Sequence, residues 1–231
     1  MLITLGAAFA YNRYATPVYE VSTTILFEEN HGKSSALGGG GDPMSNVFMG
    51  LGGMNSMQNI YNQMVILGST PVISKSLQNL DFEVSYYAVG NISVTESYKA
   101  VPFQVVWDEN HPQLIGTDFN LTIHPNGKLE LSVEGKDAVV YSYTEEKQIK
   151  RISEFSFSKT LEPGVLLSSD EFAFKILLNE QFDSKESHDF IFRFNSTESL
   201  MRKYKGSLDV SFPDDNSSII QLSLRDYNLK K

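Results

Sequence analysis

The middle of the chain, from residue 84 to residue 194, consists of many short runs in which apolar and polar residues alternate. Phe103, Val105 and Trp107 form one such run, and this spacing is typical of strands that bury one face. The letters HPNG at 124–127 separate two further runs and favour a tight hairpin turn. The pattern predicts an inserted β-rich, sandwich-like unit, which we place at residues 91–194.

The flanking segments have a different period. Apolar residues at helical spacing predict a helix over 57–67, and Thr70 followed by Pro71 predicts the start of a second one. Asn195 with Glu198 resembles a capping box that opens a third helix. Alternating runs predict one strand over 19–27 and two near the end of the chain, over 207–212 and 218–224.

This order of elements predicts an α+β fold in which both ends of the chain form an α/β layer that carries the β-rich insertion. We therefore expect a discontinuous α/β domain over 14–90 plus 195–231. Residues 1–13 begin with a mostly apolar stretch of ten residues, which is too short to span a bilayer, and continue into Tyr11 and Arg13. We interpret them as the outer end of a membrane helix with its interfacial flank. A buried N-terminal segment is the alternative.

Composition excludes several functional classes. The 231 residues are 41% hydrophobic, which suits a globular chain with a substantial core. A formal net charge of −9 argues against a nucleic-acid partner, because binding to a phosphate backbone needs a basic surface. The absence of cysteine rules out disulfides, thiolate zinc sites and cysteine nucleophiles.

No motif indicates catalysis, a cofactor or a metal. Gly32-Lys33-Ser34 has the ending of a phosphate-binding loop, but Phe27 stands where that loop needs its first glycine. The four histidines are scattered, and the adjacent acidic pairs lie in turn-like segments that nothing ties to one cleft. We therefore expect a non-enzymatic domain with no catalytic, cofactor-binding or metal-binding residues.

A glycine-rich segment over 32–55 retains apolar residues that are unusual in a solvated linker. Such residues generally pack against something, and a neighbouring subunit is one candidate. Together with the helix predicted over 57–67, this segment supplies the candidate oligomer contacts Phe48, Met49, Leu51, Ile60, Tyr61 and Met64.

Several segments resemble one protein family in their order and spacing. Residues 13–20 read RYATPVYE and lead into STTIL at 22–26, residues 62–69 read NQMVILGS, and residues 217–226 read SSIIQLSLRD. This series is similar to the extracytoplasmic domain of polysaccharide chain-length determinant (Wzz-type) proteins, or polysaccharide co-polymerases. Related segments occur in the membrane tyrosine autokinases of capsule and exopolysaccharide export. Gln63 departs from the family's glutamate, and the β-rich block replaces the long helices of some members.

The resemblance implies a non-catalytic scaffold. Members of the family form homo-oligomeric rings in the inner membrane, and this domain faces the periplasm. The implied partners are other copies of the chain, the polymerase or export machinery, the membrane through flanking helices and, as an open candidate, the nascent polysaccharide. No cofactor is implied. A cytoplasmic kinase domain beyond Lys231 is a feature of some members, and we expect the chain to be a soluble piece of such a protein.

Other classes of protein remain open at this stage. A carbohydrate-binding or adhesin-like module of the cell envelope would carry a cluster of exposed aromatic residues on the insertion. An export-pump adaptor would carry long heptad helices, and a glycan-cleaving enzyme would bring two carboxylates together in a cleft.

Overall fold

The computed structural model describes residues 18–26, 56–90, 93–98, 100–179, 185–214 and 219–226, together with Thr4, Gly6 and Phe9. The chain divides into two compact units. The β-rich unit comprises Met1–Tyr19, Leu77–Arg202 and Tyr227–Lys231, and the split unit comprises Glu20–Ser76 and Lys203–Asp226. Among the described helices, none is both long and apolar enough to cross a bilayer.

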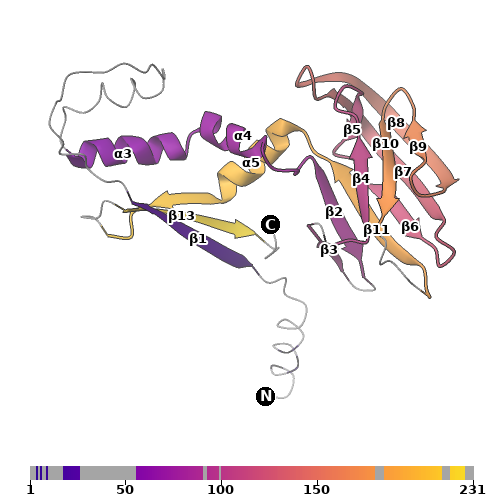
Figure 1. The fold of residues 1–231 in the computed structure, drawn as a ribbon, viewed down its shortest axis with the longest axis horizontal. Coiled ribbons are helices and arrows are strands. Elements are labelled where there is room, and N and C mark those ends of the chain that lie inside the picture. Colours follow the sequence, from indigo (N-terminus) through magenta and orange to yellow (C-terminus); the bar gives the residue numbers. More distant parts are fainter. Residues whose placement is uncertain are drawn as a thin grey trace. The chain divides into compact units, whose positions relative to one another are not determined.

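Two antiparallel-rich sheets make up the β-rich unit (Figure 1). The larger sheet has seven strands in the order β3-β2-β11-β5-β7-β6, with β8 paired to β7, and the smaller one has the order β4-β10-β9. The strands of the larger sheet are β2 (Val84–Val89), β3 (Val94–Glu96), β5 (Gln113–Ile115), β6 (Phe119–Ile123), β7 (Leu129–Ser142), β8 (Lys147–Leu161) and β11 (His188–Phe194). Those of the smaller sheet are β4 (Phe103–Trp107), β9 (Leu166–Ser168) and β10 (Ala173–Leu178).

Phenylalanine side chains fill the space between these two sheets. Phe119 of β6 stacks on Phe192 of β11, with ring centroids 4.9 Å apart, and meets Phe174 of β10 edge-on at 5.4 Å. All three rings are almost completely buried, so each contributes about 1.5–3 kcal/mol through the hydrophobic effect. This core joins the two sheets because its members come from both.

The hairpin predicted at HPNG is confirmed. β6 and β7 pair in the register Ile123↔Leu129, and the turn closes through the bond from Gly127 N–H to the carbonyl of His124 at 2.9 Å. The residues after this turn form one long strand, β7, whose first part pairs with β6 and whose later part pairs with β5. Asp137, with φ of 52°, lies at an irregularity within this strand and not in a turn between two strands.

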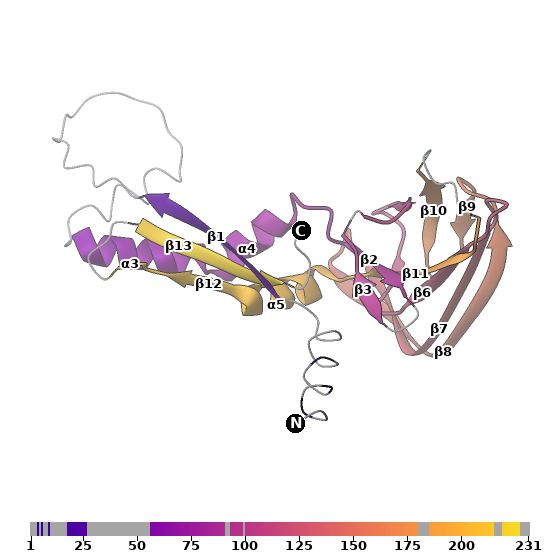
Figure 2. The ribbon, with the colours of Figure 1, turned by 90° about the horizontal axis from the view of Figure 1, so that it is seen from below.

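The split unit contains a three-stranded sheet in the order β1-β13-β12. Its strands are β1 (Tyr19–Leu26), β12 (Leu208–Ser211) and β13 (Ile219–Asp226). The helix α3 (Ser56–Leu67) lies along this sheet, and Tyr61 packs edge-on against Phe212 with ring centroids 5.0 Å apart (Figures 1 and 2). Glu20 and Arg225 form an ion pair at 3.0 Å, so β1 begins beside the point at which β13 ends.

The start of one predicted helix is confirmed and that of another differs. The helix α4 spans Thr70–Leu77, so it starts where Thr70 and Pro71 predicted, and the Thr70 hydroxyl accepts a hydrogen bond from Lys205 Nζ at 2.8 Å. The helix α5 spans Thr197–Ser207, and the Ser196 hydroxyl accepts from the N–H of Ser199 at its first turn. Ser196 is therefore the residue that caps α5, and the side chain of Asn195 makes other bonds described below.

The α+β class with an α/β layer, expected from the sequence, is wrong. Strands account for 52% of the described residues, and the three short helices account for 18%. One reason is the length of β7 and β8, which have 14 and 15 residues. Another is that β2, which we had assigned to the discontinuous domain, pairs with β11 inside the β-rich unit. The chain is a β-rich protein.

Two glycines give opposite expectations for substitution by alanine. Gly127 has φ of 76°, a conformation that costs an L-residue about 1–2 kcal/mol, so Gly127→Ala should destabilise the chain by that amount. Gly206 lies in α5 with open space around its Cα, so Gly206→Ala should stabilise by about 0.5 kcal/mol. Urea unfolding monitored by circular dichroism measures both changes. Equal effects of the two substitutions would contradict the assignment of the turn.

Candidate functional site

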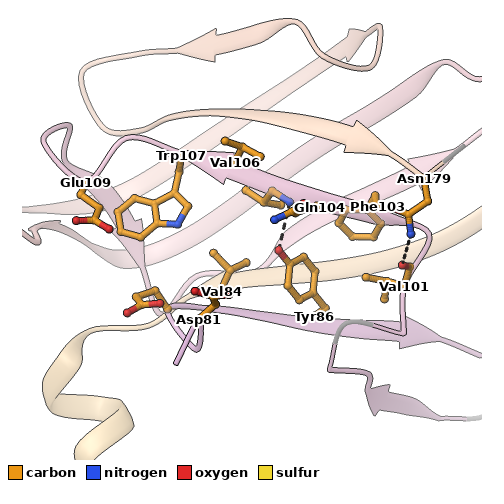
Figure 3. A pocket seen from close by; sticks show the side chains of 12 residues that line it. Asp81, Val84, Tyr86, Val101, Phe103, Gln104, Val106, Trp107, Glu109 and Asn179 are labelled. Carbon is orange, nitrogen blue, oxygen red and sulfur yellow. Dashed lines mark hydrogen bonds between the residues drawn. The ribbon is translucent and has the colours of Figure 1, made fainter. Parts of the chain in front are cut away.

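A cavity of about 500 Å³ opens on the side of the β-rich unit where β2 and β4 face each other without pairing (Figure 3). Its volume lies within the range of roughly 300–1,000 Å³ that is usual for ligand pockets. Buried apolar side chains line its inner part, and these are Val84, Tyr86, Val101, Phe103 and Val105. The Tyr86 hydroxyl accepts a hydrogen bond from the N–H of Val105 at 3.2 Å and so links the two strands.

Polar side chains occupy both ends of the cavity. Trp107 and Glu109 lie at one end, close to Asp81, and Asn179 lies at the other end beside Val101 (Figure 3). The Asn179 amide donates to the carbonyl of Val101 at 3.3 Å, which holds it in place. Asp81 and Glu83 precede β2, while Trp107 ends β4 and Glu109 follows it. The polar groups therefore come from the ends of two strands that are close in space and distant in sequence.

A network of contacts holds the acidic end of the cavity in position. The Trp107 ring packs on Tyr143 with centroids 4.5 Å apart, and the Tyr143 hydroxyl donates to the carbonyl of Asn195 at 2.6 Å. Asn195 in turn donates its backbone N–H to the carbonyl of Glu83 at 2.7 Å and its amide to Ser85 Oγ at 2.9 Å. Asn195 is thus a structural residue that fixes the segment carrying Glu83.

Burial raises the pKa of the Glu83 carboxyl above its ordinary value of 4.5. The negative charges of Asp81 and Glu109 raise this pKa further, while the backbone N–H groups of Glu83 and Phe82 lower it. Burial also raises the pKa of the Tyr143 phenol, which therefore remains a neutral hydrogen-bond donor. The acidic end of the cavity concentrates hydrogen-bond acceptors in a partly dry environment.

Sequence analysis did not find this cavity. The pair Asp108 and Glu109 was noted as solvated turn residues, and this is correct for Asp108, whose carboxylate accepts from the N–H of Asn110 at 2.9 Å. Glu109 instead lines the cavity with Asp81 and Glu83. The available signal was an acidic residue at the end of each of two predicted strands. The pattern of the strands did not show that β2 and β4 would be neighbours.

The candidate oligomer contacts from the sequence analysis have different environments. Phe48, Met49 and Leu51 lie outside the described residues. Ile60 is 7% exposed and Met64 is half-buried, whereas Tyr61 is 51% exposed. Of the contacts that the structure describes, only Tyr61 offers a largely exposed side chain.

Exposed apolar side chains extend well beyond Tyr61 in the split unit. Val65 and Ile66 follow it on α3, and Val65 is 71% exposed. The edge strand β1 contains no buried residue, and its Val21 is 60% exposed. Edge strands with exposed apolar side chains are prone to pair with other chains, so this surface is suited to an interface.

The remaining motifs from the sequence are a glycine-lysine-serine segment and the scattered histidines. Gly32-Lys33-Ser34 lies outside the described residues. His124 and His188 lie near each other, since His188 pairs with Ile123 across β11 and β6, and His124 is bonded to Ser187 Oγ at 3.1 Å and to Glu130 at 3.4 Å. Within the part of the chain that the structure describes, no cluster of histidine and acidic residues is arranged to hold a metal ion.

Comparison with known proteins adds no identification, because no protein-family model and no curated protein matches the chain.

The raised pKa of Glu83 predicts that its replacement by a neutral residue stabilises the fold, by an amount that depends on pH. A carboxyl with a higher pKa in the folded chain than in the unfolded chain destabilises the fold when it is ionised. This penalty is absent below about pH 4.5 and grows as the pH rises through the folded pKa. Glu83→Gln should therefore raise the thermal unfolding midpoint at pH 7 and have no effect at pH 3.5.

Glu154→Gln, on the exposed face of β8, is the matched control and should leave the midpoint unchanged at both pH values. If Glu83→Gln raises the unfolding midpoint as much at pH 3.5 as at pH 7, the increase comes from altered packing and not from loss of the charge.

Proposed function

We propose that the chain is the extracytoplasmic scaffold domain of an inner-membrane polysaccharide co-polymerase. In this role it regulates the chain length and export of capsule, exopolysaccharide or O-antigen through assembly into a homo-oligomeric ring. The domain itself has no catalytic task. The resemblance of residues 13–26, 62–69 and 217–226 to chain-length determinants is the starting point of the proposal.

The placement of the ends of the split unit supports this role. Glu20 and Arg225 form an ion pair although 205 positions separate them, so the chain enters and leaves the sheet at the same end. A domain held by membrane segments on both flanks needs both flanks on one side. The sheet order β1-β13-β12 meets that requirement because the first and last strands are direct neighbours.

Exposed apolar side chains on α3 and on the edge strand β1 support homo-oligomeric assembly, and they are the observation that carries the proposal. Tyr61, Val65 and Val21 are each more than half exposed, which is costly on an isolated domain. Few large side chains are fully buried among the described residues of the split unit, with Ile220 as the main example. A unit with a small core gains stability when it buries further apolar area against a second copy.

The proposed partners follow from this assembly. They are other copies of the chain, the polymerase or export machinery and the membrane through the flanking segments. The proposed location is the inner membrane, with this domain in the periplasm. Both are consequences of the family resemblance and are tested together with it.

The primary experiment measures the length distribution of the surface polysaccharide on gels. Cells that lack the gene should lose the modal length or the long polymer, and the intact full-length gene should restore them. A complementing gene with Val65→Asp should fail to restore them, because it places a charge in the proposed interface. An unchanged ladder in the deletion strain would contradict the co-polymerase role.

The control variant is Ile149→Asp, which introduces the same charge at an exposed apolar residue of β8 in the β-rich unit. It should restore the wild-type ladder. Immunoblotting must show equal amounts of both variants in the membrane, and cross-linking should show a reduced oligomer for Val65→Asp alone. Equal behaviour of the two variants would place the interface elsewhere.

A further inference from the structure

Three features of the molecule are not explained by the scaffold role. These are the cavity between β2 and β4, the exposed outer face of the β4-β10-β9 sheet and the long free edge of β8. The last two are open surfaces, and the exposed side chains of β8 include charges of both signs, such as Lys150, Arg151 and Glu154. The cavity combines an enclosed volume, an apolar floor and polar groups from several elements, which is the usual constitution of a ligand site.

The charge of the cavity restricts its ligand. Asp81, Glu83 and Glu109 line it, and its twelve lining residues include no lysine, arginine or histidine. An anionic ligand would be repelled, and the acidic groups are not arranged to hold a metal ion within the described residues. The carboxylates are therefore best suited to accept hydrogen bonds from a ligand that is rich in donors and carries no negative charge.

The aromatic and amide groups add a second restriction. Trp107 is partly exposed, and no described residue accepts a hydrogen bond from its indole N–H. Its ring is held by Tyr143 and by Phe194, at centroid distances of 4.5 Å and 5.7 Å, so it is a rigid element of the wall. Gln104 and Asn179 contribute amides farther along the cavity. A ligand that fits has both an apolar face and several hydroxyl groups.

We propose that the cavity between β2 and β4 binds a segment of a saccharide chain that carries no acidic groups. The hydroxyls of the sugar rings donate to Asp81, Glu83 and Glu109. The apolar C–H face of one ring lies against Trp107, whose N–H donates to a ring or hydroxyl oxygen. Partial burial strengthens these hydrogen bonds because water competes less for them. This inference goes beyond the scaffold role and does not depend on it.

Trp107 is the single tryptophan of the chain, so intrinsic fluorescence reports on the cavity directly. The chain is titrated with neutral trisaccharides of glucose, galactose, mannose and N-acetylglucosamine and with trigalacturonic acid. At least one neutral sugar should give a saturable change in emission, and trigalacturonic acid should give none. No response to any neutral sugar, or a stronger response to the acidic one, would overturn the inference.

Substitution of one cavity residue locates the binding. Glu109→Ala removes an exposed carboxylate that contributes little to folding, and it should weaken the neutral sugar's Kd at least about tenfold. Glu154→Ala on β8 is the matched control and should leave Kd unchanged. Equal Kd values for the two variants would place the sugar outside the cavity. Neither result bears on the scaffold role, which the length distribution of the surface polysaccharide tests independently.

Discussion

The contact between Phe119 and Phe192 is the interaction on which the β-rich unit depends. These two rings stack at 4.9 Å in the middle of a phenylalanine cluster that spans both sheets. The cluster fixes the distance between the sheets, and Gln113, which is fully buried, adds a polar tie by donating to the carbonyl of Ala173 at 3.0 Å. Where the cluster ends, toward β2 and β4, the strands separate and the cavity opens. The site is thus a consequence of how the core is filled.

The two units differ in their cores and in their exposed surfaces. The β-rich unit has a large core and a concave site, whereas the split unit has a small core and an exposed apolar surface on α3 and β1. A scaffold that assembles through one unit and senses polymer through the other would keep these tasks on separate surfaces. Asn195 shows how closely the sites are tied to the fold, because one side chain and its backbone join β2, β11 and the Tyr143 phenol.

The sequence predicted local features well and long-range ones poorly. The alternation of apolar and polar residues predicted β6, and the turn residues predicted the hairpin at Gly127. Both patterns lie within a few consecutive residues of the chain. It did not show that β7 continues as one strand of 14 residues through Gly135 and Asp137. The α+β class failed because the helices are short and β2 joins the large sheet. The cavity was missed because Glu83 and Glu109 meet only through tertiary packing.

The direct pairing of β1 with β13 has a consequence for synthesis of the protein. The first of these strands leaves the ribosome about two hundred residues before the second, as the separation of 205 positions between Glu20 and Arg225 indicates. The β-rich unit can fold in the interval, since its strands β2 to β11 all lie within Leu77–Arg202. During that time β1 has no strand to pair with and exposes Val21 to other nascent chains. Pairing of β1 with another chain and completion of the fold would therefore compete for the same edge, and a chaperone that shields β1 would favour completion of the fold.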